Sequence, residues 1–589
     1  MRKIFSVLLL SLILISSNAF SNSRVVKYHS PDKELGNQIA PSKIVYGNSN
    51  LRGGVPPIGT IPTGMTGFFD YVTNGNSIRA IQVLGDTIIC SFVLCDSTDP
   101  TGATSRVAYY TVSYDNGNSW LPAPIALTVG RSAYPDITPF VGLIGRSVVM
   151  NGRSYAPGSR GAAWLDASLG LGAITETLVP AGGRDYFAYQ IGGTKIGGAY
   201  NVPSDDSLIY ISFDYSNSTL GTPNMVATTP EMGASTRQYV AANGDNVTVM
   251  WWLNDPNAIQ NAMAYKTSTD GGATFGSIQK WLLQGDTFNG DSVTPWFGSD
   301  IIYKPGTTQL GAATNTLGFS GGAPNFGTRE GYKLLYWSPA VNSGTPTVIA
   351  DRTNFPTLQD TNLFNQLVDI QVGATAVSHP SIAYSDDGSR LVAFYSGVQT
   401  DTLDAFNFND IYVSYSDDDG ATWSSPINVT NTTDWDEMYP SVAKTGNTPG
   451  QFHVVFQSTK GPGCQSFTDL TPTYRVWEVY AKVNPLTGAI IKVNNISSEI
   501  PQGYSLKQNF PNPFNPTTSI RFEIPQTSKV TLKVYDINGK EVATLVNNEV
   551  VSAGLNEVTF GGSNLASGVY YYSLQAGDFK QTRKMVLVK

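Results

Sequence analysis

Four arginines stand where they could bind an acidic ligand. Arg131, Arg184 and Arg237 each come just before an apolar, strand-like segment, and Arg153 follows such a segment closely. A guanidinium group binds a carboxylate through two parallel hydrogen bonds, so clustered arginines could clamp an acidic sugar. The same residues could instead form salt bridges between neighbouring structural units. Both interpretations stay open from the sequence.

Carboxylates and a tyrosine offer a second chemistry, bond cleavage. Asp436 and Glu437 lie three and two residues before Tyr439, and Glu231 lies elsewhere in the chain. Hydrolysis of a glycosidic bond usually needs two carboxyl groups held about 5 to 9.5 Å apart. Tyr439, Glu437, Asp436 and Glu231 are therefore candidate catalytic residues. A solvated loop would explain the acidic run equally well, so the sequence does not decide whether the protein is an enzyme.

Metal binding has little support in the sequence. Three cysteines and three histidines are too few for a Cys/His zinc framework of ordinary spacing. Asp401, Asp404 and Asp410 could supply oxygen ligands to calcium, but they do not match the spacing of an EF-hand loop. We expect no metal site and no cofactor, with calcium at this loop as the alternative.

A short motif of the form S-x-D-x-G-x-[ST]-aromatic occurs three times. Its aspartates are Asp115, Asp270 and Asp418, separated by 155 and 148 residues, and each copy follows an alternating strand. The carboxylate can accept turn N–H groups, glycine allows positive φ, and the aromatic residue can pack between sheets. The motif therefore predicts a structural turn. The aromatic residues that complete it are Trp120, Phe275 and Trp423.

These three segments resemble Asp-boxes, the bacterial neuraminidase repeats of sialidase-like β-propellers. The resemblance covers residues 67 to about 495, and it implies a propeller whose Asp-boxes lie away from the catalytic face. Sialidases also carry an Arg-Ile-Pro motif, together with three arginines and a Tyr–Glu pair. No Arg-Ile-Pro tripeptide occurs here; Arg79, in Ser77-Ile78-Arg79-Ala80, is the nearest match. Activity of the sialidase type is therefore not implied.

The composition and strand pattern agree with an all-β protein. Hydrophobic residues make up 41% and charged residues 14%, with 58 glycines, which favours short strands over helical bundles. A repeated strand start followed by a glycine turn predicts six or seven blades. The clearest starts are Tyr134-Pro135, Arg184-Asp185, Arg237-Gln238, His379-Pro380 and Tyr439-Pro440, with weaker ones near Ile78 and Ile301.

Residues 498–589 form a different module. Short alternating strands and the turn Asp536-Ile537-Asn538-Gly539-Lys540 predict an Ig-like β-sandwich after the propeller. The N-F-P-N-P-F-N-P-T-T segment, the S-G-V-Y-Y-Y strand and the final K-M-V-L-V-K resemble the C-terminal sorting domain of the type IX secretion system. This resemblance implies that the type IX machinery is a partner and that the tail is removed after export.

The N-terminus carries a second targeting signal. Arg2 and Lys3 precede an apolar run and the small residues Ser17-Asn18-Ala19, so residues 1–19 read as a signal peptide and 20–66 as a leader or linker. No later stretch approaches the roughly 20 apolar residues of a membrane span. A net charge of −8 argues against nucleic acid. We expect a protein that passes through the periplasm and is secreted or held at the outer-membrane surface.

The leading hypothesis from the sequence is an exported propeller that binds or processes extracellular glycans or other polymers. The alternatives are a sialidase-type exo-glycoside hydrolase and a non-catalytic adhesion or scaffold propeller. Substrate, metal content and oligomeric state are not encoded in any motif found here.

Overall fold

The computed structural model describes residues 56–589 apart from several short segments. The segments left out are 63–64, 68–78, 96–98, 100–103, 143–144, 156–157, 193, 205–206, 229–230, 232–237, 256–259, 326–328, 360–374, 404–405, 463–473, 492, 498–500, 552 and 563–564. The predicted signal peptide and most of the predicted leader lie outside the described residues.

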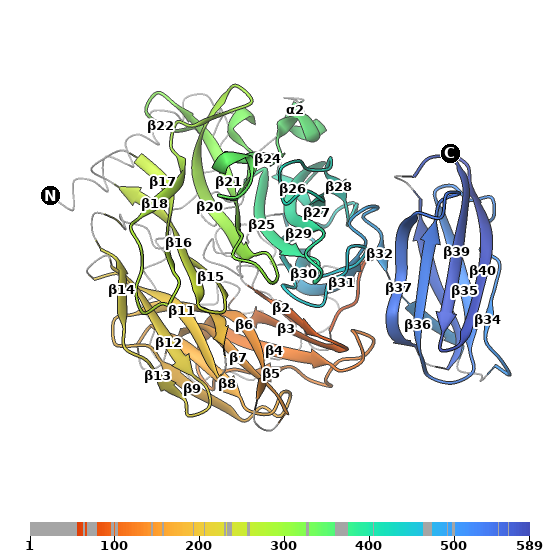
Figure 1. Cartoon of the computed structure of the whole chain (residues 1–589), viewed down its shortest axis with the longest axis horizontal. Helices are drawn as coiled ribbons and strands as arrows, with labels where there is room; N and C mark the ends of the chain where they lie inside the picture. Colours follow the sequence, from red (N-terminus) through yellow and green to blue (C-terminus); the bar gives the residue numbers. More distant parts are fainter. Residues whose placement is uncertain are drawn as a thin grey trace.

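In the described part of the chain, antiparallel strands form nine sheets, and seven of them stand side by side in a closed ring (Figure 1). Successive innermost strands contact one another around the ring, and β2 meets the last blade. The fold is a seven-bladed β-propeller, the larger of the two predicted blade numbers. The innermost strands are β2 (Ile81–Leu84), β6 (Ser132–Gly142), β10 (Arg184–Gly192), β15 (Gln238–Asn243), β20 (Asp291–Tyr303), β25 (Val377–Tyr384) and β29 (Asp436–Val442).

The other strands of blades 1 to 6 follow their innermost strand in chain order, except β19, which precedes β20 and pairs with it. Blades 1 to 3 contain β3 (Thr87–Leu94), β4 (Val107–Ser113), β5 (Ile125–Ala126), β7 (Gly145–Ser154), β8 (Arg160–Asp166), β9 (Ile174–Leu178), β11 (Lys195–Val202), β12 (Ser207–Asp214), β13 (Thr219–Leu220) and β14 (Asn224–Ala227). Blades 4 to 6 contain β16 (Asn246–Asp255), β17 (Gln260–Ser268), β18 (Gln279–Leu283), β19 (Thr287–Phe288), β21 (Leu310–Ser320), β22 (Ala323–Asn325), β23 (Leu334–Trp337), β24 (Thr347–Ala350), β26 (Leu391–Leu403), β27 (Phe406–Ser416) and β28 (Ile427–Asn428). Helical structure in the described residues is limited to α2 (Pro356–Gln359) and single turns at Arg329–Gly331, Asn342–Gly344 and Arg352–Asn354.

Blade 7 closes the ring with strands from both ends of the propeller. It contains β29, β30 (Phe452–Thr459) and β31 (Val476–Val483), and the free side of β31 pairs with both β32 (Ile490–Ile491) and β1 (Thr66–Gly67). An isolated bridge joins Thr60 to Tyr480 beyond β1. The segment predicted as a leader or linker therefore also supplies the closing strand. Two residues are too few to show a strand period in the sequence.

The C-terminal module is a sandwich of two four-stranded sheets beside blade 7 (Figure 1). Their orders are β33-β38-β35-β34 and β37-β36-β39-β40. The first strand precedes the predicted boundary at 498. The strands are β33 (Val493–Ser497), β34 (Ser505–Leu506), β35 (Thr517–Ile524), β36 (Ser528–Tyr535), β37 (Glu541–Val551), β38 (Gly554–Gly561), β39 (Gly568–Ala576) and β40 (Phe579–Leu587).

Burial differs between the two modules for a simple geometric reason. Every residue of β3 is buried, because neighbouring blades cover both faces of the blade. In β35, buried residues alternate with more exposed ones, because only one face of each sandwich sheet packs on the other sheet. Among the described residues, no helix is long and apolar enough to cross a membrane.

Candidate functional site

The three repeated motifs fold into one kind of turn between the third and fourth strands of their blades. In blade 6, Asp418 accepts hydrogen bonds from the Thr422 N–H (2.9 Å), the Thr422 hydroxyl (2.6 Å) and the Ser416 hydroxyl (2.7 Å). Asp115 and Asp270 accept the equivalent bonds in blades 1 and 4. These three segments are called the Asp turns below. Because each carboxylate is used within its own turn, its role is structural.

Each Asp turn also joins its blade to the preceding one. The aromatic residue at the end of the turn packs edge-on against a tyrosine in the third strand of that neighbour. Ring centroids are 5.4 Å apart in all three pairs, which are Trp120–Tyr480, Phe275–Tyr210 and Trp423–Tyr336. The turn glycine packs equally closely, since a Cβ added to Gly420 would lie 2.1 Å from Tyr336. The Asp turns are therefore joints between blades.

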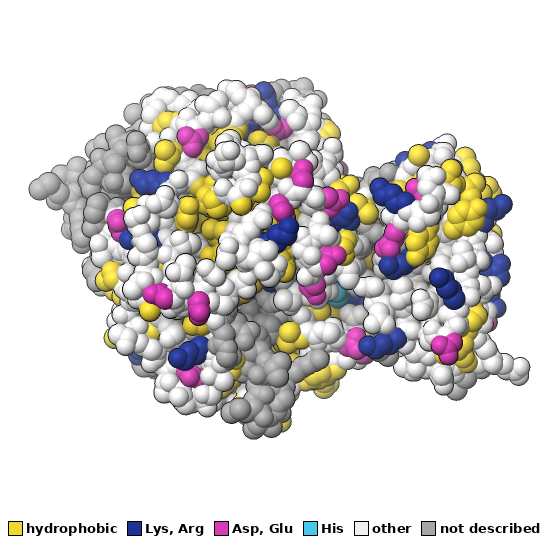
Figure 2. Space-filling view, viewed as in Figure 1, with side chains coloured by type: hydrophobic (Ala, Val, Ile, Leu, Met, Phe, Trp, Pro, Cys, Tyr) yellow, Lys and Arg dark blue, Asp and Glu magenta, His cyan; other side chains and the backbone are white. Residues whose placement is uncertain are grey.

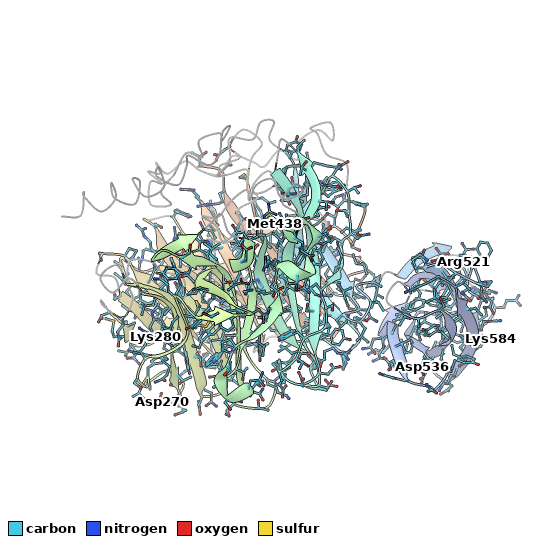
Figure 3. The ribbon with its side chains drawn as sticks, turned by 90° about the horizontal axis from the view of Figure 1, so that it is seen from above. Asp270, Lys280, Met438, Arg521, Asp536 and Lys584 are labelled. Atoms are coloured by element: carbon cyan, nitrogen blue, oxygen red, sulfur yellow. The ribbon has the colours of Figure 1, made fainter. Side chains whose placement is uncertain are left out.

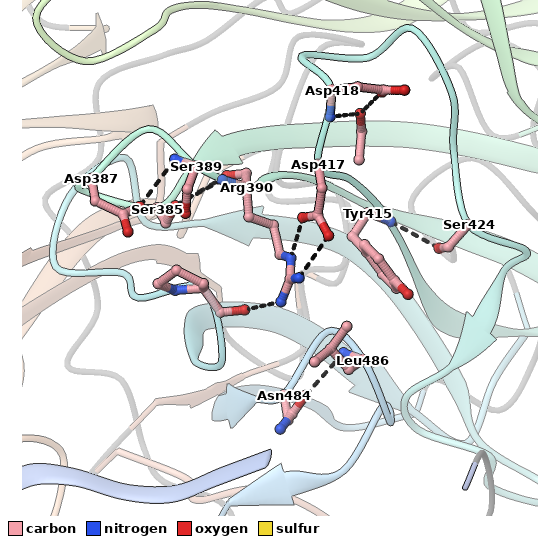
Figure 4. A network of polar contacts seen from close by, with 12 residues as sticks. Ser385, Asp387, Ser389, Arg390, Tyr415, Asp417, Asp418, Ser424, Asn484 and Leu486 are labelled. Carbon is pink, nitrogen blue, oxygen red and sulfur yellow. Dashed lines mark hydrogen bonds and ion pairs between the residues drawn. The ribbon is translucent and has the colours of Figure 1, made fainter. Parts of the chain in front are cut away.

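Further polar contacts tie blades 6 and 7 together beside the third Asp turn (Figure 4). Arg390 donates two hydrogen bonds to Asp417, at 2.7 and 2.8 Å, and a third to the carbonyl of Pro449. Its guanidinium also lies 4.9 Å from the centroid of the Tyr415 ring. On this side of the propeller, these polar side chains are therefore used in contacts within and between blades. Figure 2 shows acidic and basic side chains interspersed over the propeller face in view.

Four innermost strands share an irregularity close to their starts. In blades 2, 3, 6 and 7, two residues of the innermost strand face one residue of the second strand, which is a β-bulge. The first bulge residue has a positive φ in each: 58° at Tyr134, 54° at Asp185, 53° at His379 and 56° at Tyr439. Blade 5 has a larger register shift there, with Gly298 at φ 88°. These five residues are called the bulge ring.

The bulge ring lies on the face opposite the Asp turns. Strands 1 and 3 of an antiparallel blade run in the same direction, so they start at the same face, and the Asp turns follow the ends of third strands. Figure 3 shows this separation: Asp270 lies at one face, and Met438, which directly precedes Tyr439, lies toward the other. In a propeller, equivalent positions of innermost strands approach the axis. The ring therefore surrounds one end of the axis.

Members of the bulge ring contact one another directly or through a shared partner. The His379 and Tyr439 rings are 4.5 Å apart between centroids. Arg153 donates from Nε to Asp185 at 2.6 Å, and its guanidinium lies 5.4 Å from the centroid of the Tyr134 ring. All four of these ring side chains are buried. One aromatic pair, His379–Tyr439, and one arginine-bridged pair, Tyr134 and Asp185, thus join neighbouring blades around the axis.

Buried ion pairs fill the axis beyond the bulge ring. Arg79, ahead of β2, donates from Nε to Asp136 of blade 2 at 2.9 Å. Lys444, after β29, pairs with Asp300 of blade 5 and donates to the carbonyl of Ile382 at 2.6 Å. Arg79, the nearest match to the sialidase Arg-Ile-Pro motif, is therefore committed to an inter-blade salt bridge.

The candidate arginines have different positions in the structure. Arg153 lies within β7 and forms the buried salt bridge to blade 3 described above. Arg131 comes just before β6, and its guanidinium lies 4.2 Å from the centroid of the Tyr155 ring. Arg184 is the first residue of β10 and is half-buried. Arg237 lies outside the described residues. Arg131 and Arg153 share the face of the bulge ring, but Arg153 already has a carboxylate partner.

The acidic candidates of blade 7 form a buried cluster next to the bulge ring. Asp436 accepts the Asn409 N–H at 2.7 Å. Glu437 accepts hydroxyl hydrogen bonds from Thr432 (2.7 Å) and Ser458 (3.0 Å), and it shares a side-chain hydrogen bond with Asp410. Burial raises the pKa of the Glu437 carboxyl well above its ordinary value and also raises the pKa of Asp410. Burial therefore favours the protonated form of both carboxyls.

Two other predicted sites lie elsewhere. Glu231 pairs with Lys266 of β17 at 2.9 Å, which places it at the outer strands of blades 3 and 4. Of the calcium candidates, Asp401 is half-buried in β26, Asp410 belongs to the cluster above, and Asp404 lies outside the described residues. Within the described ranges, no three His, Cys, Asp or Glu side chains are grouped to hold a metal ion. Calcium stays a prediction.

Sequence reasoning missed most of the bulge ring. Tyr134-Pro135, Arg184-Asp185 and His379-Pro380 were recognised only as strand starts. Arg106 was also missed; its guanidinium donates to the Tyr155 hydroxyl. The available signal was the aromatic-Pro pair recurring at the same place in three blades. The sequence does not reveal that the aromatic residue of each pair has a positive φ, because bulky residues rarely adopt one.

Comparison with known families identifies the tail. Residues 508–589 match the family described as "Secretion system C-terminal sorting domain". The C-terminal sandwich is therefore a type IX secretion sorting domain, and the protein is exported to the outer-membrane surface or released. The chain is thus an exported seven-bladed propeller. No curated protein matches the sequence.

Solved structures resemble the chain only remotely. An α-L-arabinanase from Penicillium chrysogenum with bound arabinobiose is 11% identical, with 72% of this chain and 98% of that chain covered and a TM-score of 0.36. A protein of unknown function from Dyadobacter fermentans is 13% identical, with 71% and 98% covered and a TM-score of 0.35. The NanB sialidase from Streptococcus pneumoniae is 8% identical, with 71% and 70% covered and a TM-score of 0.33. Likeness at this level assigns no activity to the chain.

Proposed function

We propose that this exported propeller binds extracellular glycans at the bulge ring. The observation that carries the proposal is the positive φ of Tyr134, His379 and Tyr439. A bulky residue in this conformation costs about 1–3 kcal/mol, and such strain concentrates at ligand-binding sites. In blade 5 the positive φ of the larger register shift falls on a glycine, Gly298. Aromatic side chains kept at the strained positions of three other blades indicate a role beyond the backbone.

The chemistry of the ring suits a sugar. Aromatic rings offer flat apolar faces, while hydroxyl, imidazole and carboxylate groups of the same ring can donate or accept hydrogen bonds. The charge of Arg153 is balanced by Asp185, and burial raises the pKa of both Glu437 and Asp410, which favours their uncharged forms. A largely uncharged glycan therefore fits the site better than an acidic one. This differs from the arginine clamp that the sequence suggested.

Two further assignments belong to the proposal. The Asp turns are Asp-boxes, supported by the same carboxylate hydrogen bonds in all three copies. Residues 1–19 are a signal peptide, supported by their charged start and apolar run and by the presence of a secretion domain at the other end. Release of an N-terminal peptide, measured by sequencing the exported protein, tests the second assignment.

Binding to a panel of soluble polysaccharides and oligosaccharides tests the main proposal. Asparagine accepts positive φ better than most residues, so Tyr439→Asn and His379→Asn remove the rings while keeping the bulge. Each variant should weaken binding about tenfold or more. Asp270→Ala, at an Asp turn on the other face, is the control and should bind normally. Equal loss in all three variants, or no glycan bound by the parent protein, would contradict the proposal and favour the scaffold alternative.

Hydrolysis is the second candidate, because Tyr439 lies beside Asp436 and Glu437 in one strand. The direct hydrogen bond between Glu437 and Asp410 counts against it, since the catalytic carboxyls of glycosidases are usually about 5 Å apart or more. Release of 4-methylumbelliferone from a glycoside panel that includes the sialoside separates the two functions. Turnover lost in Tyr439→Phe would favour a sialidase-type enzyme.

A further inference from the structure

One strand of the sandwich comes from the propeller side of the chain. β33 (Val493–Ser497) precedes the residues that match the sorting domain, 508–589, yet it lies in the sandwich sheet. It runs antiparallel to β38, from Val493 opposite Val558 to Ser497 opposite Leu555. An exposed bend at Gln502–Gly503 precedes β34.

Without β33, the sandwich would still consist of two sheets, one of three strands and one of four. β34, β35 and β38 form one, and β36, β37, β39 and β40 form the other. Without β33, β38 would be an edge strand with one row of backbone N–H and C=O groups left unpaired. Such an edge accepts an extended peptide through main-chain hydrogen bonds. β33 is therefore an added strand that covers this edge.

We propose that the β38 edge is a strand-docking site and that β33 is its occupant, so that propeller and sorting domain stay associated after the backbone between them is cut. Two contacts outside β33 support the association. β32 lies against β38, and Gly450 of blade 7 lies against the side chain of Thr544 in β37. Release of the tail then requires β33 to leave the β38 edge as well as cleavage of a peptide bond.

The place of the cut decides which product keeps the strand. Cleavage after Ser497 leaves β33 on the propeller and vacates the β38 edge of the tail when the two separate. Cleavage before Val493 leaves the strand on the tail, whose sheet then stays complete. Only the first case couples release to strand withdrawal.

The test uses the full chain with a protease recognition sequence inserted after Gly503, where a side chain would meet nothing within 4 Å. After cleavage, gel filtration at about 100 µM should show the sandwich co-eluting with the propeller. Hydrogen exchange should show the amides of Gly554–Gly561 protected as in the uncut chain. Dilution should release the sandwich, because a short added strand binds only modestly.

The variant for this test is Asn494→Pro combined with Asn495→Pro. Successive amides in a strand point to opposite sides, so the pair removes one donor toward β38 whichever residue faces it. After cleavage, the sandwich of this variant should elute separately and its β38 amides should exchange faster. Gln502→Pro, in the bend, is the matched control and should behave as the parent does.

Three outcomes would overturn the proposal. The parental halves could separate at once at 100 µM, or parent and double variant could co-elute equally. An uncut parent that elutes as a dimer, with the uncut double variant monomeric, would show that the occupant is a strand from a second copy. Because none of these readouts involves a glycan, the result is independent of the proposed function.

Discussion

Glu478 is a buried carboxyl group in β31 of blade 7. The Gln457 side-chain amide donates to it at 2.7 Å, and burial raises the pKa of Glu478 to about 7. An unfolded chain would lose this proton near the ordinary pKa of about 4.3. Between these two values the folded state holds more protons than the unfolded state, so stability falls as pH rises.

Replacing Glu478 with Gln should remove this pH dependence. The amide keeps an oxygen for the Gln457 hydrogen bond and cannot ionise, so the variant should be more stable than the parent at pH 8 by about 3 kcal/mol. At pH 4 the two proteins should differ little. Urea unfolding at pH 4, 6 and 8 measures the effect. Parallel curves for parent and variant would show that Glu478 has an ordinary pKa.

Asp418 holds its turn through three hydrogen bonds without contributing to the bulge ring. Asp418→Ala should lower the free energy of unfolding by about 1–3 kcal/mol, through lost hydrogen bonds and a looser joint to Tyr336. Thermal unfolding measures this loss of stability. Glycan affinity, measured separately, should stay unchanged. A variant with the parental melting temperature but no binding would show that the Asp turn is part of a binding site.

At the scale of the element, each bulge needs a close fit to the strand beside it. Gly152 in β7 faces the bulge that starts at Tyr134, and a Cβ added there would lie 2.6 Å from the carbonyl oxygens of Ala133 and Tyr134. The backbone cannot move away without breaking the pairing of β6 with β7. A glycine is therefore required at this position, although its own φ is ordinary.

Gly152→Ala should destabilise the propeller by about 1–3 kcal/mol, because an extra methyl group forces backbone shifts in a packed sheet. It should also disturb the Tyr134 side of the bulge ring. Gly276→Ala is a control within blade 4, since its Cβ would make only an ordinary contact, 3.6 Å from the Thr267 carbonyl. Equal melting temperatures for both variants would mean that the bulge adapts easily.

The sequence predicted the elements that depend on local chemistry. An Asp turn depends on hydrogen bonds to the aspartate from the residues two positions before it and four positions after it. Asp115, Asp270 and Asp418 could therefore be recognised by spacing. The bulges could not, because their position is set by pairing with the second strand. The ion pair of Arg79 with Asp136 spans 57 residues, and that of Lys444 with Asp300 spans 144. No local pattern predicts either.

At the scale of the whole molecule, the fold class was predicted correctly, while the candidate binding and catalytic residues stay predictions. Repetition of short strands indicated a propeller, and the tail motifs indicated the sorting domain. The sequence predicted arginines at the face that carries the bulge ring, but folding pairs Arg153 with Asp185, and it brings His379 against Tyr439. Burial and pairing across blades decide which side chains remain available, and both depend on the closed ring.

The order of modules predicts how the exported protein is processed. We expect the mature chain to end between Ser497 and Gln508, so that the sorting domain is removed and β33 stays with the propeller. Intact mass of protein from the culture medium or cell surface measures this end. Peptides that continue to Lys589 in most molecules would contradict it, and an end before Val493 would leave the strand on the tail.

The pairing of both propeller ends with β31 of blade 7 also means that the chain could begin at a different blade. Thr66 pairs with Trp477 and Ile491 with Lys482, so the two ends of the propeller lie along one strand, five positions apart or roughly 17 Å. A short linker would join them. New ends could then open in an exposed turn of another blade, and the circularly permuted chain would form the same contacts. The contacts of the closed ring therefore do not fix which blade comes first in the chain.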